Sequence, residues 1–237
     1  IHQTKGGLDV PAVAVASLQL PADGTSGTWE LARITTVDSM GVELDGGLLR
    51  AFDLGAQAVR VLEHGTVTVP AGITTTPPAW TGESGGIVVL FADTIDLSGA
   101  IDVSARGFEG GQGFESPDAH GCHNSTPEDP RDAPRGEGLV GDSVTRGRLN
   151  QGNGGGGGGC HNAGGGGGGG AGVGGRGGDS LSIDPIGGDG GAALLFSAPT
   201  LMQFGGGGGA GEANDDDSFG GNGSGIVFIR ARRLDGS

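Results

Sequence analysis

The chain has 237 residues, of which 57 are glycine, and its formal net charge is −15. This strong negative charge argues against nucleic acid and anionic membrane surfaces as partners. No apolar run approaches the roughly 18 residues that a membrane helix needs, so membrane insertion is not expected. The glycines follow no Gly-X-Y period, which excludes collagen.

Residues 1–81 have the composition of a β-rich domain. The segments 13–20, 29–37 and 66–69 are rich in apolar and β-branched residues, and no segment sustains a helical period of 3.6 residues. We therefore expect an all-β fold plus irregular structure, with little or no α-helix. The strands are expected to be antiparallel, in a sandwich- or solenoid-like arrangement. A pair of prolines marks a domain boundary just before Trp80.

Residues 82–237 form the second expected domain, packed with the first as one unit. Glycine marks the change, because 14 of the 57 glycines lie in residues 1–105 and the other 43 lie in residues 106–237. Three uninterrupted runs stand out: Gly154 to Gly159, Gly164 to Gly170, and Gly205 to Gly209.

Such runs are often flexible linkers, but we interpret these as ordered struts of a polyglycine-II bundle. In that conformation the chain has about three residues per turn and rises roughly 3.1 Å per residue. Its N–H and C=O groups point outward and need partners when they are buried. Neighbouring struts can supply these partners, and only glycine lets the backbones approach closely enough.

A repeated strand accompanies the glycine runs. Gly86 to Asp96 aligns with Gly225 to Asp235, and Gly191 to Phe196 is a looser third copy. We expect the three copies to meet in one apolar sheet, whose burial supplies about 25 cal/mol per Å². The residues expected in its assembly strands are Ile87, Val89, Ile226 and Phe228.

Two cysteines stand in the same tripeptide, Cys-His-Asn, beginning at Cys122 and at Cys160. We favour a disulfide between them, which closes a loop of about 39 residues and stabilises the fold by roughly 4 kcal/mol. Free thiols and a Cys₂His₂ zinc site are the alternatives. The zinc site is less favoured because adjacent side chains in an extended chain point apart. A disulfide fits an oxidising, extracellular environment.

A short acidic segment is a weak candidate for calcium. Its oxygen ligands would come from Asn214, Asp215, Asp216 and Asp217. It lacks the spacing of an EF-hand, so a solvated loop tip is favoured and no cofactor is expected. No serine, cysteine or histidine lies in a recognisable nucleophile motif, so the sequence predicts no enzyme.

The block of poly-glycine, cysteine, a short polar segment and poly-glycine resembles the extracellular glycine-rich domain of the anaplastic lymphoma kinase and leukocyte tyrosine kinase receptors. It is also similar to glycine-rich surface proteins of bacteria, particularly myxobacteria, some of which carry gliding-motility names. That likeness rests on a glycine-led apolar strand, His161-Asn162-Ala163 before a glycine run, and the last glycine run before the final strand. The resemblance implies a β-fold joined to polyglycine-II helices at a cell surface.

We therefore expect a non-enzymatic, extracellular structural or adhesive module of a bacterial cell-surface protein or fibre, secreted or held at the cell surface. Its partners would be the remainder of a larger parent protein or copies of itself. The alternatives are a subunit of a self-assembling filament, an ice-binding module and a module that binds a protein ligand. Phage tip adhesins also use polyglycine-II bundles, which is consistent with an adhesive role.

Overall fold

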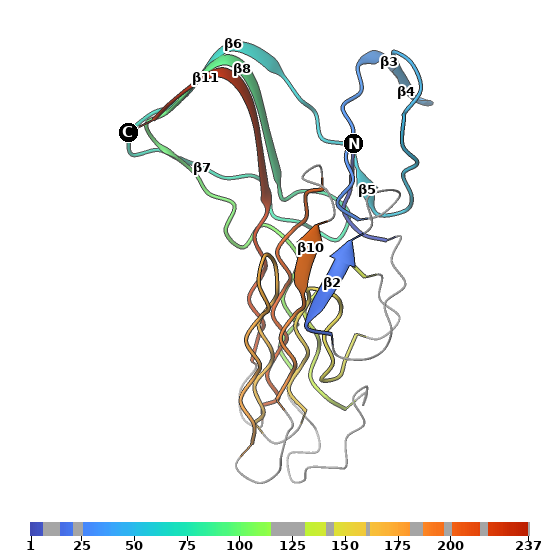
Figure 1. The fold of residues 1–237 in the computed structure, drawn as a ribbon, viewed down its shortest axis with the longest axis vertical. Coiled ribbons are helices and arrows are strands. Elements are labelled where there is room, and N and C mark those ends of the chain that lie inside the picture. Colours follow the sequence, from blue (N-terminus) through green and yellow to red (C-terminus); the bar gives the residue numbers. More distant parts are fainter. Residues whose placement is uncertain are drawn as a thin grey trace.

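The computed structural model describes residues 1–6, 15–20, 26–114, 131–140, 145–159, 162–180, 187–196, 201–213 and 218–236. Within these ranges the chain is strand-rich and has no α-helix, as the sequence predicts (Figure 1). The strands are β1 (His2–Gln3), β2 (Ser17–Leu20), β3 (Ile34–Asp38), β4 (Gly41–Leu44), β5 (Ala56–Gln57), β6 (Glu63–Val69), β7 (Thr74–Thr75), β8 (Ile87–Leu97), β9 (Ala100–Ile101), β10 (Ala193–Phe196) and β11 (Ile226–Gly236).

The largest sheet has three parallel strands in the order β11-β8-β6. The repeated sequences of β8 and β11 lie side by side in register, with Ile226 opposite Ile87 and Asp235 opposite Asp96. The sheet curves away from the rest of the molecule, and the C-terminal end of β11 lies at its far tip (Figure 1).

Two expectations about the strands are wrong. The main sheet is parallel, and antiparallel pairing occurs only between β1 and β5 and between β3 and β4 among the strand pairs of the described chain. The third copy of the repeat, β10, pairs with β2 instead of joining β8 and β11. Its place in the sheet is taken by β6.

Short strands continue the pairing beyond the main sheet. β7 pairs in parallel with β9, just as β6 pairs with β8, so two strand–turn–strand units lie against each other. Backbone hydrogen bonds from Gly99 to Val69 and from Ala100 to Ile73, at 2.7 and 2.9 Å, join the turns. The strand pairing therefore extends around the bend.

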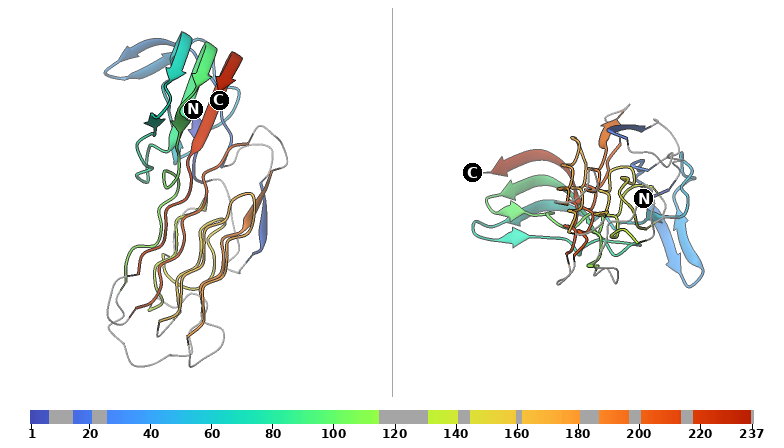
Figure 2. Two further views of the ribbon diagram at one scale, coloured as in Figure 1. Left: turned by 90° about the vertical axis from the view of Figure 1, so that its left-hand side faces the viewer. Right: turned by 90° about the horizontal axis from the view of Figure 1, so that it is seen from below.

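The glycine-rich segments form the lower part of the molecule. Extended chains run side by side along the long axis and lead upward into β10 and β11 (Figures 1 and 2). Because the chain travels down this bundle and back between β8 and β11, both strands enter the sheet from the same end. A long connection of this kind is what parallel pairing requires.

An apolar core joins the sheet to the bundle. Trp80, Phe108 and Phe204 pack edge to face, with ring centroids 5.3 to 6.4 Å apart. The other buried apolar residues of this core are Leu20, Leu139, Leu194, Leu201 and Ile226. The segment that precedes the first long glycine run adds a partly buried carboxylate, Glu137. Its oxygens accept hydrogen bonds from the indole N–H of Trp80 at 3.0 and 3.1 Å and from Nζ of Lys5 at 2.8 Å.

Candidate functional site

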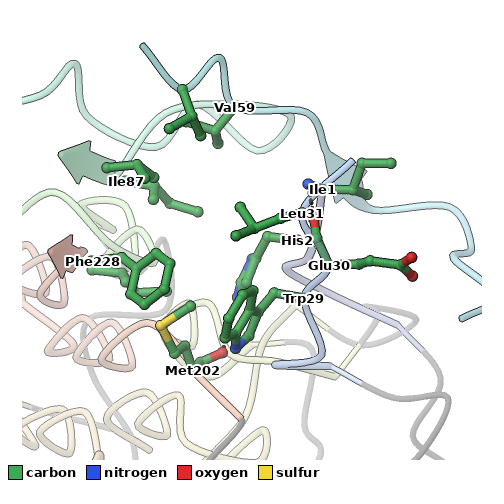
Figure 3. Close-up of a pocket in the computed structure, with 12 residues that line it drawn as sticks. Ile1, His2, Trp29, Glu30, Leu31, Val59, Ile87, Met202 and Phe228 are labelled. Carbon is green, nitrogen blue, oxygen red and sulfur yellow. Dashed lines mark hydrogen bonds between the residues drawn. The ribbon is translucent and has the colours of Figure 1, made fainter. Parts of the chain in front are cut away.

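A pocket lies where the main sheet meets the N-terminal segment (Figure 3). It holds about 390 Å³ of space, counting its open mouth, and its wall is mostly apolar. The lining residues are Ile1, His2, Trp29, Glu30, Leu31, Val59, Val61, Ile87, Val89, Met202, Ile226 and Phe228. Alternate residues of β8 and β11 point into it because side chains on a strand alternate between two faces.

Aromatic contacts shape one side of the pocket. The ring of Trp29 lies 4.8 Å from that of Phe228, and Phe228 lies 5.7 Å from Phe91. Figure 3 shows Phe228 and Ile87 on the sheet side, with Trp29 and Leu31 facing them. The contacts hold the segment around Trp29 against the sheet.

The imidazole of His2 lies at the base of this region and is buried. Its Nε2 is 2.9 Å from the carbonyl oxygen of Met202, so Nε2 must carry the proton that is donated there. Its Nδ1 then accepts from the hydroxyl of Thr4 at 3.0 Å, while that hydroxyl accepts from the amide of Gln57 at 2.9 Å. Burial lowers the pKa of His2 to about 4, so the ring is neutral near pH 7.

The carboxylate of Glu30 points away from the pocket (Figure 3). It accepts hydrogen bonds from the backbone N–H groups of Leu49 and Arg50, at 2.8 to 3.0 Å. The two titratable side chains of the lining, His2 and Glu30, are thus both engaged in structural bonds. The pocket offers an apolar contact surface to a small group, without an acid–base pair poised over it.

The glycine bundle is the second candidate site, and its backbone bonds follow a simple rule. In residues 164–170, every third residue bonds to the same neighbouring segment. Gly164, Gly167 and Gly170 donate to the carbonyls of Gly178, Gly175 and Gly172, at 2.9, 2.7 and 3.0 Å. Gly166 and Gly169 donate to Gly156 and Asn153, at 2.8 and 2.7 Å, and accept from Gly209 and Gly206 at 2.8 and 2.9 Å.

Consecutive residues of an inner segment bond to different neighbours. Gly155, Gly156 and Gly157 donate in turn to Gly207, Asp189 and Gly147, at 2.8 to 2.9 Å. These acceptors belong to three separate segments. Gly158 donates to Ala210 at 2.9 Å, and Ala210 lies in the same segment as Gly207, the acceptor of Gly155. The bonds therefore radiate around each chain instead of lying in one sheet plane.

Close packing, and not backbone conformation, explains the glycines here. None of the glycines at 154–158 or 164–170 has a positive φ. A Cβ on Gly165, Gly166, Gly168 or Gly169 would nevertheless come closer than 3.0 Å to a backbone oxygen of a neighbouring segment. At Gly170 the same atom would meet open space. Two of every three positions in this segment therefore exclude any side chain.

The predicted strut and assembly-strand residues fall in these two sites. Gly154, Gly164, Gly170, Gly205 and Gly209 each donate a backbone hydrogen bond, and their acceptors are Gln151, Gly178, Gly172, Ser224 and Gly166. Gly159 is buried at the end of its run. The assembly-strand residues Ile87, Val89, Ile226 and Phe228 line the pocket, with Ile87 opposite Ile226 and Val89 opposite Phe228.

The predicted disulfide and calcium residues lie outside the described residues. They are Cys122, Cys160, Asn214, Asp215, Asp216 and Asp217. The disulfide therefore stays a prediction. Within the described ranges, no group of three or more His, Cys, Asp or Glu residues could hold a metal ion.

The solvent-facing residues of the bundle were not predicted, although their spacing in the sequence indicates them. Val173, Arg176 and Asp179 are spaced three residues apart and are all exposed. Arg176 and Asp179 form an ion pair at 2.6 Å. Non-glycine residues at this spacing mark the face of an edge chain that points to solvent. The pocket was also missed, because Trp29 and Met202 reach it from distant parts of the sequence.

No protein-family model, no curated protein and no solved structure matches this chain. No helix in the described part of the chain is long and apolar enough to cross a membrane.

Proposed function

We propose that the chain is a non-enzymatic, extracellular structural or adhesive module of a bacterial cell-surface protein or fibre. Its glycine-rich segments act as polyglycine-II helices, which together make a rigid stalk. The observation that carries the proposal is the three-residue period of the bonds between segments, because polyglycine II has three residues per turn. Each chain then directs its N–H groups toward several neighbours.

The spacing of the segments supports the same conformation. Side chains are excluded at Gly165, Gly166, Gly168 and Gly169, so the chains lie closer than any other residue permits. The ion pair between Arg176 and Asp179 fits as well, since residues three apart share one face of such a helix.

A structural role also agrees with how the polar groups are used. The buried His2 and the partly buried Glu137 both take part in hydrogen bonds that join distant segments of the fold. The bundle itself presents backbone and few reactive side chains. The extracellular and bacterial parts of the proposal rest on composition and on the resemblance to glycine-rich surface proteins.

Amide hydrogen exchange, followed by NMR, tests the bundle. The amides of Gly155, Gly156 and Gly167 should exchange slowly, because each donates to another segment. The amides of Gly175 and Gly178 have no backbone acceptor in the described chain and provide fast-exchanging controls within the same bundle. Exchange at unfolded-peptide rates at Gly155 and Gly167 would rule the bundle out.

Antibody labelling of intact source cells tests the location. An antibody against the chain should label cells whose membranes have not been permeabilised. Labelling that requires permeabilisation would place the protein inside the cell and remove the extracellular part of the proposal.

A further inference from the structure

Both outer strands of the main sheet carry an edge that the described chain leaves unpaired. β11 pairs with β8 on one side, and β6 pairs with β8 on the other. In both views of Figure 2, no described segment lies beyond β11 on its outer side. Unpaired edges of this length template the addition of another strand. β11 offers 11 residues for such pairing.

The side-chain rows that cross the sheet end in complementary residues. Partners in register place Glu63, Phe91 and Arg230 in one row, with the acidic residue on β6 and the basic residue on β11. The guanidinium of Arg230 lies over the ring of Phe91, 5.6 Å from its centroid. One edge of the row is therefore negative and the other positive.

A second row has apolar residues at both ends. Val67 on β6, Ile95 on β8 and Leu234 on β11 are partners in register. Ile95 is fully buried, whereas Leu234 at the β11 edge is 58% exposed. An apolar residue on a strand added beyond β11 would cover Leu234 as its row neighbour.

The geometry points to a second copy of this chain as the occupant of the β11 edge, entering in parallel through its own β6. This assembly deepens the proposed structural role and rests on it. Suppose that β6 of the second copy continues the same side-chain rows beyond β11. Glu63 of one copy then faces Arg230 of the next. The same step places Val67 against Leu234.

A second arginine of β11, Arg232, fits this register. Arg232 already forms an ion pair with Asp93 of its own copy at 3.2 Å, and it would face Gly65 of the added strand, which has no side chain to obstruct it. Pairing of β11 with another β11 is disfavoured instead. Across a two-fold axis it would bring the arginines of the two copies together on a shared edge.

Sheet twist makes room for the bundles. Strands lie about 4.8 Å apart, so three strands per copy give a step of roughly 14 Å. Each strand turns by roughly 20–25° relative to its neighbour, so successive copies turn by roughly 60–75°. Their bundles then fan out around the sheet axis. Because the contact joins two different edges, it extends into an open filament.

Charge reversal, read by sedimentation velocity at low salt, tests the contact. The variants Glu63→Arg and Arg230→Glu each place like charges at the proposed contact. When the two variants are mixed in equal amounts, opposite charges face each other again at every junction. The controls Glu83→Arg and Arg33→Glu make the same charge changes at exposed residues that belong to neither β6 nor β11. Thermal melting of every variant verifies that it is folded.

The wild-type chain and both controls should associate with increasing concentration. Each single reversal should raise the concentration needed for association by roughly tenfold, and the mixture should restore the wild-type behaviour. A wild-type chain that stays monomeric at millimolar concentration would overturn the inference. So would single reversals that associate like the wild type, or a mixture that fails to recover. Slow amide exchange in the bundle with no association would leave the structural role standing without the filament.

Discussion

A single methyl group placed inside the bundle should separate two segments. Gly168 faces the carbonyl oxygen of Gly206, and a Cβ there would come closer than 3.0 Å to that oxygen, a separation that real Cβ atoms do not adopt. The two segments are held together nearby by the bonds from Gly206 to Gly169 and from Gly209 to Gly166, at 2.9 and 2.8 Å. Relief of the overlap must weaken both bonds.

We therefore expect Gly168→Ala to lower the free energy of unfolding by about 3 kcal/mol. Weakening of two backbone hydrogen bonds contributes about 1 kcal/mol in total, and overpacking of a tight interior contributes a further 1–3 kcal/mol or so. For a chain of this length, each kcal/mol shifts the melting temperature by about 2–4 °C. A decrease of roughly 6–12 °C should be visible by calorimetry.

Gly175→Ala is the matched control. A Cβ on Gly175 meets nothing within 4 Å, and its φ is not positive. The same change of residue should leave the stability unchanged or raise it by about 0.4–1 kcal/mol, because alanine restricts the unfolded chain. If the two variants melt alike, the assignment of inner and outer positions in the bundle is wrong.

Two further predictions concern the pH dependence and the cysteines. Because the pKa of His2 is about 4 in the fold and 6.5 when unperturbed, its stabilising contribution is complete above about pH 6.5 and is lost as the pH falls toward 4. Urea titrations at pH 7 and pH 4.5 should show a loss of at most about 3 kcal/mol from this group, and His2→Gln should lack that part of the loss. An equal loss in the variant would contradict the assignment. Intact mass after alkylation without reductant should show no modified thiol at Cys122 or Cys160, whereas two alkylated thiols in native material would exclude the disulfide.

The repeated strands show which features of the strand pairing can be predicted from the sequence. Their apolar composition and equal spacing predict that Gly86 to Asp96 and Gly225 to Asp235 lie together, and these segments pair in register. Their direction was not predictable from hairpin signals, because direction depends on the path of the long connection through the bundle. The looser copy pairs with β2 instead, and Gly191, just before it, donates to Gly167 of the bundle.

In the bundle, the sequence does not predict which residues face inward. A run such as Gly164 to Gly170 contains no side chain that could reveal which of its residues face inward. Only an edge chain carries that information, through Val173, Arg176 and Asp179. The pocket is equally hidden, because it forms where the segment around Trp29 meets strands that lie far away in the sequence.

The crosswise bonds of the bundle also determine how the molecule would respond to mechanical load. The segments run along the long axis, and their hydrogen bonds join one segment to the next (Figure 1). A pull along that axis would load many bonds in shear at the same moment, whereas a sideways pull would open them one after another. Forced unfolding depends on the barrier to rupture. The proposed stalk would therefore be stiffest in the direction in which a tethered surface protein is pulled.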